Sequence, residues 1–236
     1  MIKILLYIIG SVLIISTIAG IVGLNKKQEA KTKKHEEVVA LGDSLTYGVG
    51  DNTGNGYVSD LQLLLSQNKG GAVTVHNYGI PGQQSDGLLY QIKNTDVKDD
   101  LDDADYFIIF IGTNDVLKSN GHNLLPIYEK RLEVGKADYE NNIREILSII
   151  RNKNQEAPIL FLGLYNPFPD SVQIEQVIEE WNKTSNEIIN EYPRVKFIST
   201  NELFQKKSTE YFSDSLHPNK KGYKLITKKI VNEYDF

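Results

Sequence analysis

The apolar run at residues 106–111 (YFIIFI) constrains the fold of this chain more than any other stretch. Six consecutive apolar residues indicate a strand that is covered on both faces, as the central strands of parallel sheets are. Shorter strand-like runs are expected at 37–41, 73–78, 159–162 and 195–198. Helical apolar spacing follows each of these runs.

Strands and helices therefore alternate five times along the chain. Such alternation predicts right-handed crossovers, a parallel sheet and helices on both of its faces. We expect the third helix to carry its apolar stripe over residues 139–150, with Asp138 as its cap. No internal repeat is visible, and 236 residues suit one α/β domain with a short appendage.

The first 36 residues differ in composition from the rest. No charged residue occurs from Ile4 to Leu24, a length that can cross a bilayer as a helix and exceeds a usual signal-peptide core. We expect a transmembrane signal anchor at residues 1–24, with a cleaved signal peptide and a buried helix as the alternatives. Residues 25–36 are expected to form a charged linker, and residues 37–236 the folded domain.

An apolar amino-terminal segment before one long domain is the usual arrangement of an exported protein. We therefore expect a single-pass protein of the cell membrane with its domain outside the cell, or a secreted protein if the segment is cleaved. Positive charge tends to stay in the cytoplasm, and five lysines after the segment favour the opposite orientation: Lys26, Lys27, Lys31, Lys33 and Lys34.

The charge balance and the absence of cysteine exclude several classes of function. A net charge of −5 argues against nucleic-acid binding, which normally needs a basic face. Without cysteine there is no disulfide framework, no thiolate nucleophile and no cysteine-ligated metal. Six aspartates within residues 96–105 lack the spacing of a known calcium loop, so we expect a solvated surface, with a calcium site as the alternative. We expect neither a cofactor nor a metal.

Three polar clusters follow the ends of the first three predicted strands. Ser44 follows the first strand, residues 79–82 (GIPG) the second, and residues 112–115 (GTND) the third. Parallel strands end at one edge of the sheet, where open α/β sheets bind their ligands. We therefore expect the three clusters to converge.

A fourth polar cluster, at residues 214–217 (DSLH), supplies a base. Serine is a weak nucleophile until a base removes its proton, and histidine suits that task near neutral pH. On a tight turn, Asp214 can reach Nδ1 of His217 and leave Nε2 free for Ser44. Asp43 is expected to brace the bend at Ser44 through backbone hydrogen bonds.

Acyl transfer also generates an oxyanion, which needs hydrogen-bond donors. The candidates are the backbone N–H groups of Ser44 and Gly82 and the side-chain amide of Asn114. Gly79 competes with Gly82 for this role, because both glycines permit close backbone approach.

These four clusters resemble the conserved blocks of the SGNH hydrolases, also called GDSL esterases/lipases. The similarity rests on residues 42–45 (GDSL), Gly82, residues 112–115 and the pair Asp214 and His217, in that order. It covers residues 37–234, nearly the whole predicted domain. Secreted or membrane-anchored bacterial lipases and acylhydrolases are the most similar in appearance.

The resemblance implies a flavodoxin-like, three-layer α/β/α sandwich around a five-stranded parallel sheet. It implies a catalytic triad of Ser44, His217 and Asp214. It also implies an oxyanion hole formed by Ser44, Gly82 and Asn114.

The expected function is hydrolysis of a carboxylic ester through an acyl-serine intermediate. Lipid esters, small acyl esters, thioesters and the acetyl esters of cell-wall glycans all fit as substrates. Tyr165, Asn166 and Phe168 are expected either to line the substrate pocket or to pack their loop. Two alternatives stay open: a flavodoxin-like FMN-binding module that holds phosphate at residues 44–46, and a surface-binding protein whose triad has lapsed.

Overall fold

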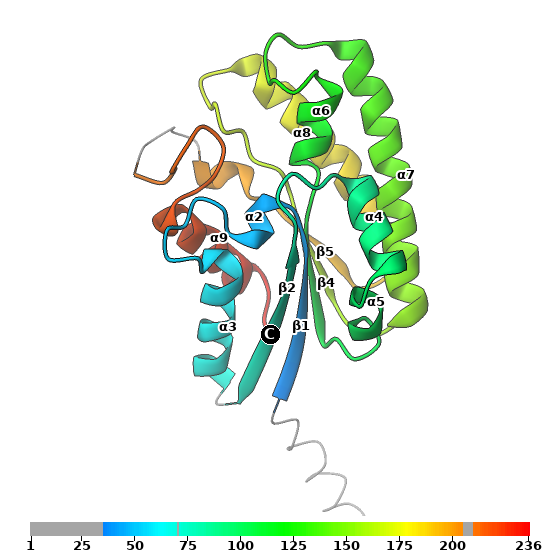
Figure 1. Ribbon diagram of the computed structural model, residues 1–236, viewed down its shortest axis with the longest axis vertical. Helices are drawn as coiled ribbons and strands as arrows, with labels where there is room; N and C mark the ends of the chain where they lie inside the picture. Colours follow the sequence, from blue (N-terminus) through cyan, green and yellow to red (C-terminus); the bar gives the residue numbers. More distant parts are fainter. Residues whose placement is uncertain (1–34, 70, 205–209) are drawn as a thin grey trace, which may run out of the picture. The chain divides into compact units, whose positions relative to one another are not determined.

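Five parallel strands, in the order β2-β1-β3-β4-β5, form the centre of the fold (Figure 1). Their bounds are His35–Gly42 (β1), Ala72–Gly79 (β2), Tyr106–Phe110 (β3), Ile159–Leu162 (β4) and Val195–Ile198 (β5). In the central pairings Val39 lies opposite Phe107, and Phe107 lies opposite Ile159. This is the flavodoxin-like order, which changes its winding direction between β1 and β3. The predicted α/β fold is confirmed.

The computed structural model describes residues 35–69, 71–204 and 210–236. The predicted membrane segment at 1–24 and the linker up to residue 34 lie outside the described residues. Within the described ranges, no helix is both long enough and apolar enough to cross a membrane. β1 begins at His35, two residues before the predicted start of the domain at residue 37.

Helices cover both faces of the sheet (Figure 1). One face is covered by α3 (Gly56–Lys69) and α9 (Lys220–Glu233). The other is covered by α4 (Ser85–Asn94), α5 (Val97–Asp100), α7 (Glu129–Lys153) and α8 (Val172–Ile189). Side chains alternate across a strand, so β1 contributes to both apolar cores: Val38 and Ala40 pack toward α3 and α9, whereas Val39 and Leu41 pack toward α4 and α7.

α7 begins at Glu129, so the predicted helix cap at Asp138 is wrong. Before Tyr139, this helix buries only Leu132. One apolar residue does not make a helical pattern, so the sequence does not indicate these first turns. The residue before the helix, Tyr128, is held by Asn120 of the preceding loop, whose side-chain Oδ1 accepts the Tyr128 N–H at 2.7 Å.

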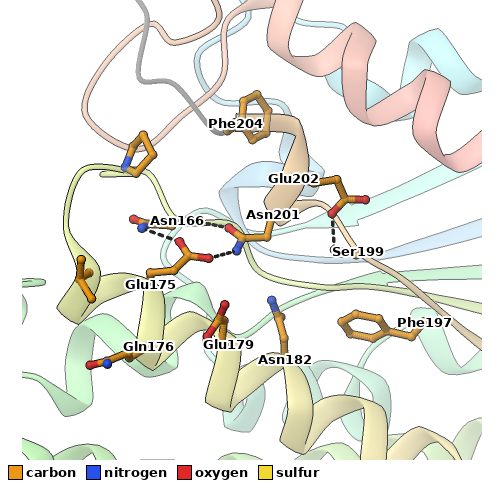
Figure 2. A pocket seen from close by; sticks show the side chains of 12 residues that line it. Asn166, Glu175, Gln176, Glu179, Asn182, Phe197, Ser199, Asn201, Glu202 and Phe204 are labelled. Atoms are coloured by element: carbon orange, nitrogen blue, oxygen red, sulfur yellow. Dashed lines mark hydrogen bonds between the residues drawn. The ribbon is translucent and has the colours of Figure 1, made fainter.

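Polar side chains tie together the loops at the carboxyl ends of β4 and β5 (Figure 2). Glu175 of α8 accepts hydrogen bonds from the amides of Asn166 and Asn201, and Asn201 Oδ1 accepts the Asn166 N–H at 2.7 Å. Asn201 begins the short helix η1 (Asn201–Phe204). Asn166 therefore packs its loop, beside a cavity of about 760 Å³.

Candidate active site

A sharp bend at the end of β1 places Ser44 at the start of the short helix α2 (Ser44–Tyr47). The bend needs glycine before it, because a Cβ on Gly42 would lie 2.2 Å from the Phe110 carbonyl oxygen and 2.3 Å from the Thr46 hydroxyl. Asp43 caps α2, since its Oδ1 accepts the Leu45 N–H at 2.9 Å. Ser44 is thereby held at the carboxyl edge of the sheet, next to the change in winding direction.

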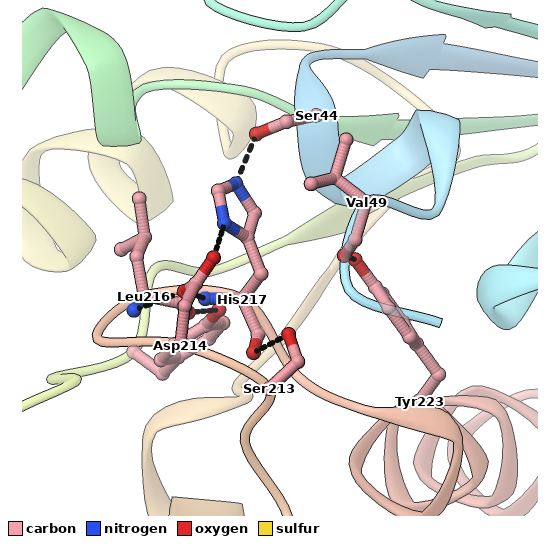
Figure 3. Close-up of polar contacts among 8 residues, drawn as sticks. Ser44, Val49, Ser213, Asp214, Leu216, His217 and Tyr223 are labelled. Atoms are coloured by element: carbon pink, nitrogen blue, oxygen red, sulfur yellow. Dashed lines mark hydrogen bonds and ion pairs between the residues drawn. The ribbon is translucent and has the colours of Figure 1, made fainter. Parts of the chain in front are cut away.

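Ser44, His217 and Asp214 form one hydrogen-bonded chain (Figure 3). Ser44 Oγ lies 2.9 Å from His217 Nε2, although the two residues are 173 positions apart in sequence. His217 Nδ1 lies 2.8 Å from Asp214 Oδ2. The structure thus brings together the three residues that the sequence singles out as a triad.

Asp214 is held in its orientation by the turn on which it lies. Its Oδ1 accepts the backbone N–H groups of Leu216 and His217, both at 2.7 Å. Burial acts to raise the pKa of Asp214, but these two backbone hydrogen bonds and the His217 ring outweigh it and lower the pKa below its usual value. The carboxylate is therefore charged at neutral pH, which favours the His217 tautomer with a proton on Nδ1 and leaves Nε2 free to accept from Ser44.

Asn114 connects the bend at Ser44 with the loop after β2. It is the second residue of α6 (Thr113–Ser119), which follows β3. Its Nδ2 donates to Asp43 Oδ2 and to the Gln83 carbonyl, both at 3.0 Å. The three polar clusters that follow β1, β2 and β3 therefore meet at one edge of the sheet, as expected.

The two candidate glycines of the β2 loop differ in their surroundings. The Gly79 N–H donates to Asn77 Oδ1 at 3.0 Å, and a Cβ on Gly79 would lie 2.3 Å from the Tyr47 backbone nitrogen. Gly79 is therefore required for close packing against α2. Gly82 has a φ of +80° and open space around the position of a Cβ. In the described part of the chain, the N–H groups of Gly82 and Ser44 have no hydrogen-bond acceptor.

Two carboxyl groups are buried behind this edge. Burial raises the pKa of Asp43 to about 7 and the pKa of Asp115 to about 6. Asp115 accepts hydrogen bonds from both the hydroxyl and the backbone N–H of Ser85, the first residue of α4. Asp115 thereby fixes the end of the loop that carries Gly82.

A match to a known protein family identifies the class of enzyme to which this site belongs. A family model described as the GDSL-like lipase/acylhydrolase family matches residues 40–225. The chain belongs to this family. It is accordingly a GDSL hydrolase, an enzyme that cleaves carboxylic esters.

Two curated bacterial proteins are similar to this GDSL hydrolase. The uncharacterized protein YpmR of Bacillus subtilis (strain 168) is 34% identical over 216 residues, which cover 88% of this chain and 85% of YpmR. The spore germination lipase LipC of Bacillus licheniformis is 27% identical over 205 residues, which cover 82% of this chain and 94% of LipC.

Solved structures share the fold. The lipase Lip_vut3 from a goat rumen metagenome superimposes with a TM-score of 0.75 at 25% identity, covering 84% of this chain and 96% of that one. Axe2, an acetylxylan esterase from Geobacillus stearothermophilus, has a TM-score of 0.68 at 20% identity, covering 85% and 94%. The second likeness concerns the fold alone.

A cavity of about 390 Å³ lies beside the turn that carries Asp214 and His217 of this GDSL hydrolase. Leu216, adjacent to His217, forms part of its wall, as does Leu117, one helical turn after Asn114 in α6. Phe168 also faces this cavity. The remaining lining is half apolar, from Leu124, Leu125 and Ile174, and half polar, from His122, Asn123 and Ser215.

Two residues hold the His217 loop, a role that was predicted for neither from the sequence; Tyr165 was expected to line the substrate pocket or to pack its own loop. The Tyr165 hydroxyl donates to the Leu216 carbonyl at 2.6 Å, so this tyrosine braces the loop. Gly50 has a φ of +97°, and a Cβ there would lie 2.4 Å from the Pro218 carbonyl oxygen and 2.9 Å from His217 Cβ. Neither residue belongs to a recognisable motif. Each contributes through a contact with residues that are distant in sequence, and only the folded chain forms this contact.

The described residues contain no group of three or more histidine and acidic side chains that could hold a metal ion. His76 contacts two carboxylates through different ring nitrogens, Glu37 from Nε2 at 2.7 Å and Asp100 from Nδ1 at 3.4 Å, so the three side chains do not converge on one point.

Proposed function

We propose that this GDSL hydrolase cleaves carboxylic esters through an acyl-serine intermediate on Ser44. The observation that carries the proposal is the hydrogen-bonded chain from Ser44 Oγ through His217 to Asp214, with distances of 2.9 and 2.8 Å. A nucleophile within reach of a base, and a base oriented by a third group, is the arrangement that activates a serine hydroxyl.

In the first step, Ser44 Oγ attacks the ester carbonyl carbon while its proton passes to His217 Nε2. His217 then gives this proton to the leaving alcohol, and the acyl group stays on Ser44. A water molecule then gives a proton to His217 Nε2 and attacks the acyl carbon. The bond from this carbon to Ser44 Oγ breaks, His217 returns the proton to Ser44 Oγ, and the acid leaves. Asp214 keeps its charge throughout and stabilises the positively charged His217 ring.

The negative charge on the substrate oxygen is stabilised by the backbone N–H groups of Ser44 and Gly82 and by the Asn114 amide. The first two donors are supported by their having no acceptor among the described residues. Donors that are fixed before the reaction cost no reorganisation when the charge forms.

The cavity beside the turn of Asp214 and His217 supports an apolar acyl group as the part of the substrate that is bound. Its volume of about 390 Å³ falls toward the small end of ligand sites, which range over about 300–1,000 Å³. Six of its nine lining residues are leucine, isoleucine or phenylalanine, whose side chains cannot hydrogen-bond a sugar. We therefore favour esters of short or medium fatty acids over acetylated cell-wall glycans.

The proposal is tested by the turnover of p-nitrophenyl butyrate. We expect Ser44→Ala and His217→Ala each to lower turnover by at least about a thousandfold. Because the two residues act as one unit, the double variant should be no slower than either single variant. Ser59→Ala, at an exposed position of α3, serves as the matched serine control and should keep wild-type turnover.

Circular dichroism must show each variant folded. Wild-type turnover in folded Ser44→Ala would remove this serine from the mechanism. A double variant whose losses multiply would show that Ser44 and His217 act independently, which also contradicts the proposal.

A further inference from the structure

The side-chain amide of Asn114 has no free hydrogen. Its Nδ2 carries two hydrogens, and its two acceptors, Asp43 Oδ2 and the Gln83 carbonyl, each lie 3.0 Å away. These acceptors also fix which way the amide faces, because a flipped amide would place its oxygen against a carboxylate and a carbonyl. An oxyanion can therefore gain a hydrogen bond from Asn114 only if one of the two acceptors gives up its own.

Asp43 does more than a helix cap requires. Its side chain is 1% exposed, and one carboxyl oxygen takes the Leu45 N–H while the other takes the Asn114 amide. Asparagine or serine caps a helix as well as aspartate does, without the cost of burying a carboxylate. The second carboxyl oxygen, which capping does not use, reaches the proposed oxyanion donor.

The two acceptors of Asn114 differ in strength. Hydrogen bonds to a charged acceptor are roughly twice as strong as those to a neutral one. When an oxyanion forms beside Ser44, it competes for an Asn114 hydrogen with one neutral carbonyl and one carboxyl group. Above about pH 7, where the Asp43 carboxyl group is ionised, the bond to the Gln83 carbonyl is the weaker of the two and is the one that breaks.

We propose that Asp43 is a positioning residue for ester hydrolysis: it retains one Asn114 hydrogen and so aims the other at the oxyanion. Gln83 holds that second hydrogen only in the resting enzyme. Asp43 thereby couples the bend that carries Ser44 to a donor from the end of β3. This inference rests on the proposed function, and it adds a residue that acts through Asn114 without touching the substrate.

Asp43→Asn tests the proposal with little change in shape. The new side chain keeps an oxygen for the Leu45 N–H, but it turns an amide NH₂ toward the NH₂ of Asn114. Two donors then face each other, and Asn114 loses its orientation. We expect kcat for p-nitrophenyl butyrate to fall at least about tenfold, with KM changed by less than about threefold, because the lost interaction is made only in the transition state.

The same substitution in an Asn114→Ala background separates positioning from a general structural role. Asn114→Ala alone should lower kcat by about 10²-fold or more, the usual effect of losing one oxyanion donor. Adding Asp43→Asn to Asn114→Ala should change kcat by less than about threefold, because the residue it positions is gone. Asp105→Asn is the matched control, a half-buried carboxylate that accepts the Glu37 N–H at 3.1 Å at the amino end of β3, the sheet edge opposite Ser44, and it should leave kcat unchanged.

The proposal is overturned if Asp43→Asn turns over like the wild type, or if its effect is as large without Asn114 as with it. If Asp43→Asn does not fold, Asp43→Ser replaces it, since serine still caps α2 but cannot reach Asn114. The proposed function fails separately, through an active Ser44→Ala variant measured in the same series.

Discussion

The buried carboxyl group of Asp115 makes the free energy of unfolding depend on pH. Its carboxyl group is 4% exposed and holds the start of α4 through Ser85. Burial raises its pKa to about 6, well above the usual value of an aspartate near 4. The folded protein therefore holds a proton on Asp115 at pH values where the unfolded chain has lost it.

This pKa predicts the sign of a pH effect on stability. Between about pH 4 and pH 6, the folded state binds more protons at Asp115 than the unfolded state, so the free energy of unfolding falls as pH rises. The contribution is at most about 1.4 kcal/mol per pH unit. Asp115→Asn lacks this group and should lose that part of the slope.

Urea unfolding of the wild type and of Asp115→Asn at several pH values measures the difference. The gap between the two free energies should change steadily between about pH 4 and pH 6 and level off above. A gap that is constant over this range would show that Asp115 has an ordinary pKa in the folded protein.

Single residues could be predicted best where the reaction requires a particular side chain, such as a nucleophile or a base. Ser44, His217 and Asp214 stand in short motifs at spacings that the reaction can use, and the structure places them in contact. The roles of Gly50 and Tyr165 could not be found in this way. Their importance comes from contacts with a loop more than fifty residues further along the chain, at Leu216 to Pro218.

The His217 turn packs against the loop from Gly48 to Gly56. Val49 accepts the Tyr223 hydroxyl at 2.6 Å, and Gly50 lies against His217 and Pro218. The position of the base therefore depends on a loop next to the nucleophile. This contact joins the first and last parts of the domain directly behind the triad.

Gly50→Ala should lower both stability and turnover. The positive φ alone costs an alanine about 1 kcal/mol, and the added Cβ would also push the His217 turn away from Ser44. We expect turnover of p-nitrophenyl butyrate to fall at least about tenfold, since a displacement of about 1 Å can cost a hundredfold.

Gly54→Ala is the matched control for this substitution. Gly54 also has a positive φ, of +72°, but a Cβ there would meet nothing within 4 Å. It should lose a similar amount of stability from backbone strain and keep its turnover. Equal turnover losses in the two variants would contradict the role assigned to Gly50.

Elements were predicted well where burial leaves a clear pattern. β3, β4 and β5 are short apolar or alternating runs, and their observed bounds lie within a residue of those expected. The helices α2, α5 and α6 were missed because four to seven residues are too few to show a helical period. They form through caps and contacts at the strand ends, which only the folded chain provides.

The topology of the whole domain explains why its site is assembled from distant segments. β1 and β3 are neighbours in the sheet, and the chain winds in opposite directions from them. The loops after both strands therefore leave a crevice at the carboxyl edge, where Ser44 and Asn114 lie. The His217 turn reaches the same edge from the opposite end of the chain.

The apolar cavity at this edge predicts a dependence on acyl-chain length. Each methylene buried in it is worth about 0.8 kcal/mol, or about fourfold in kcat/KM. We expect kcat/KM for p-nitrophenyl esters to rise from acetate and then to level off or fall once the cavity is full.

Leu117→Phe should make kcat/KM level off at a shorter acyl chain than in the wild type, because Leu117 forms part of the cavity wall and phenylalanine is larger. Val134→Phe adds the same kind of bulk at an exposed position of α7, so it should keep the wild-type profile. A flat profile in the wild type would contradict the assignment of this cavity to the acyl group, and so would an unchanged profile in Leu117→Phe.

The central claim is that the Ser44 hydroxyl is the nucleophile. The most direct measurement is mass spectrometry of the protein after reaction with a fluorophosphonate, which bonds covalently to an activated serine. We predict one phosphonyl group per chain, on the peptide that contains Ser44, and no such adduct in Ser44→Ala. Folded wild-type protein that stays unlabelled, or that carries the group on another residue, would contradict the account.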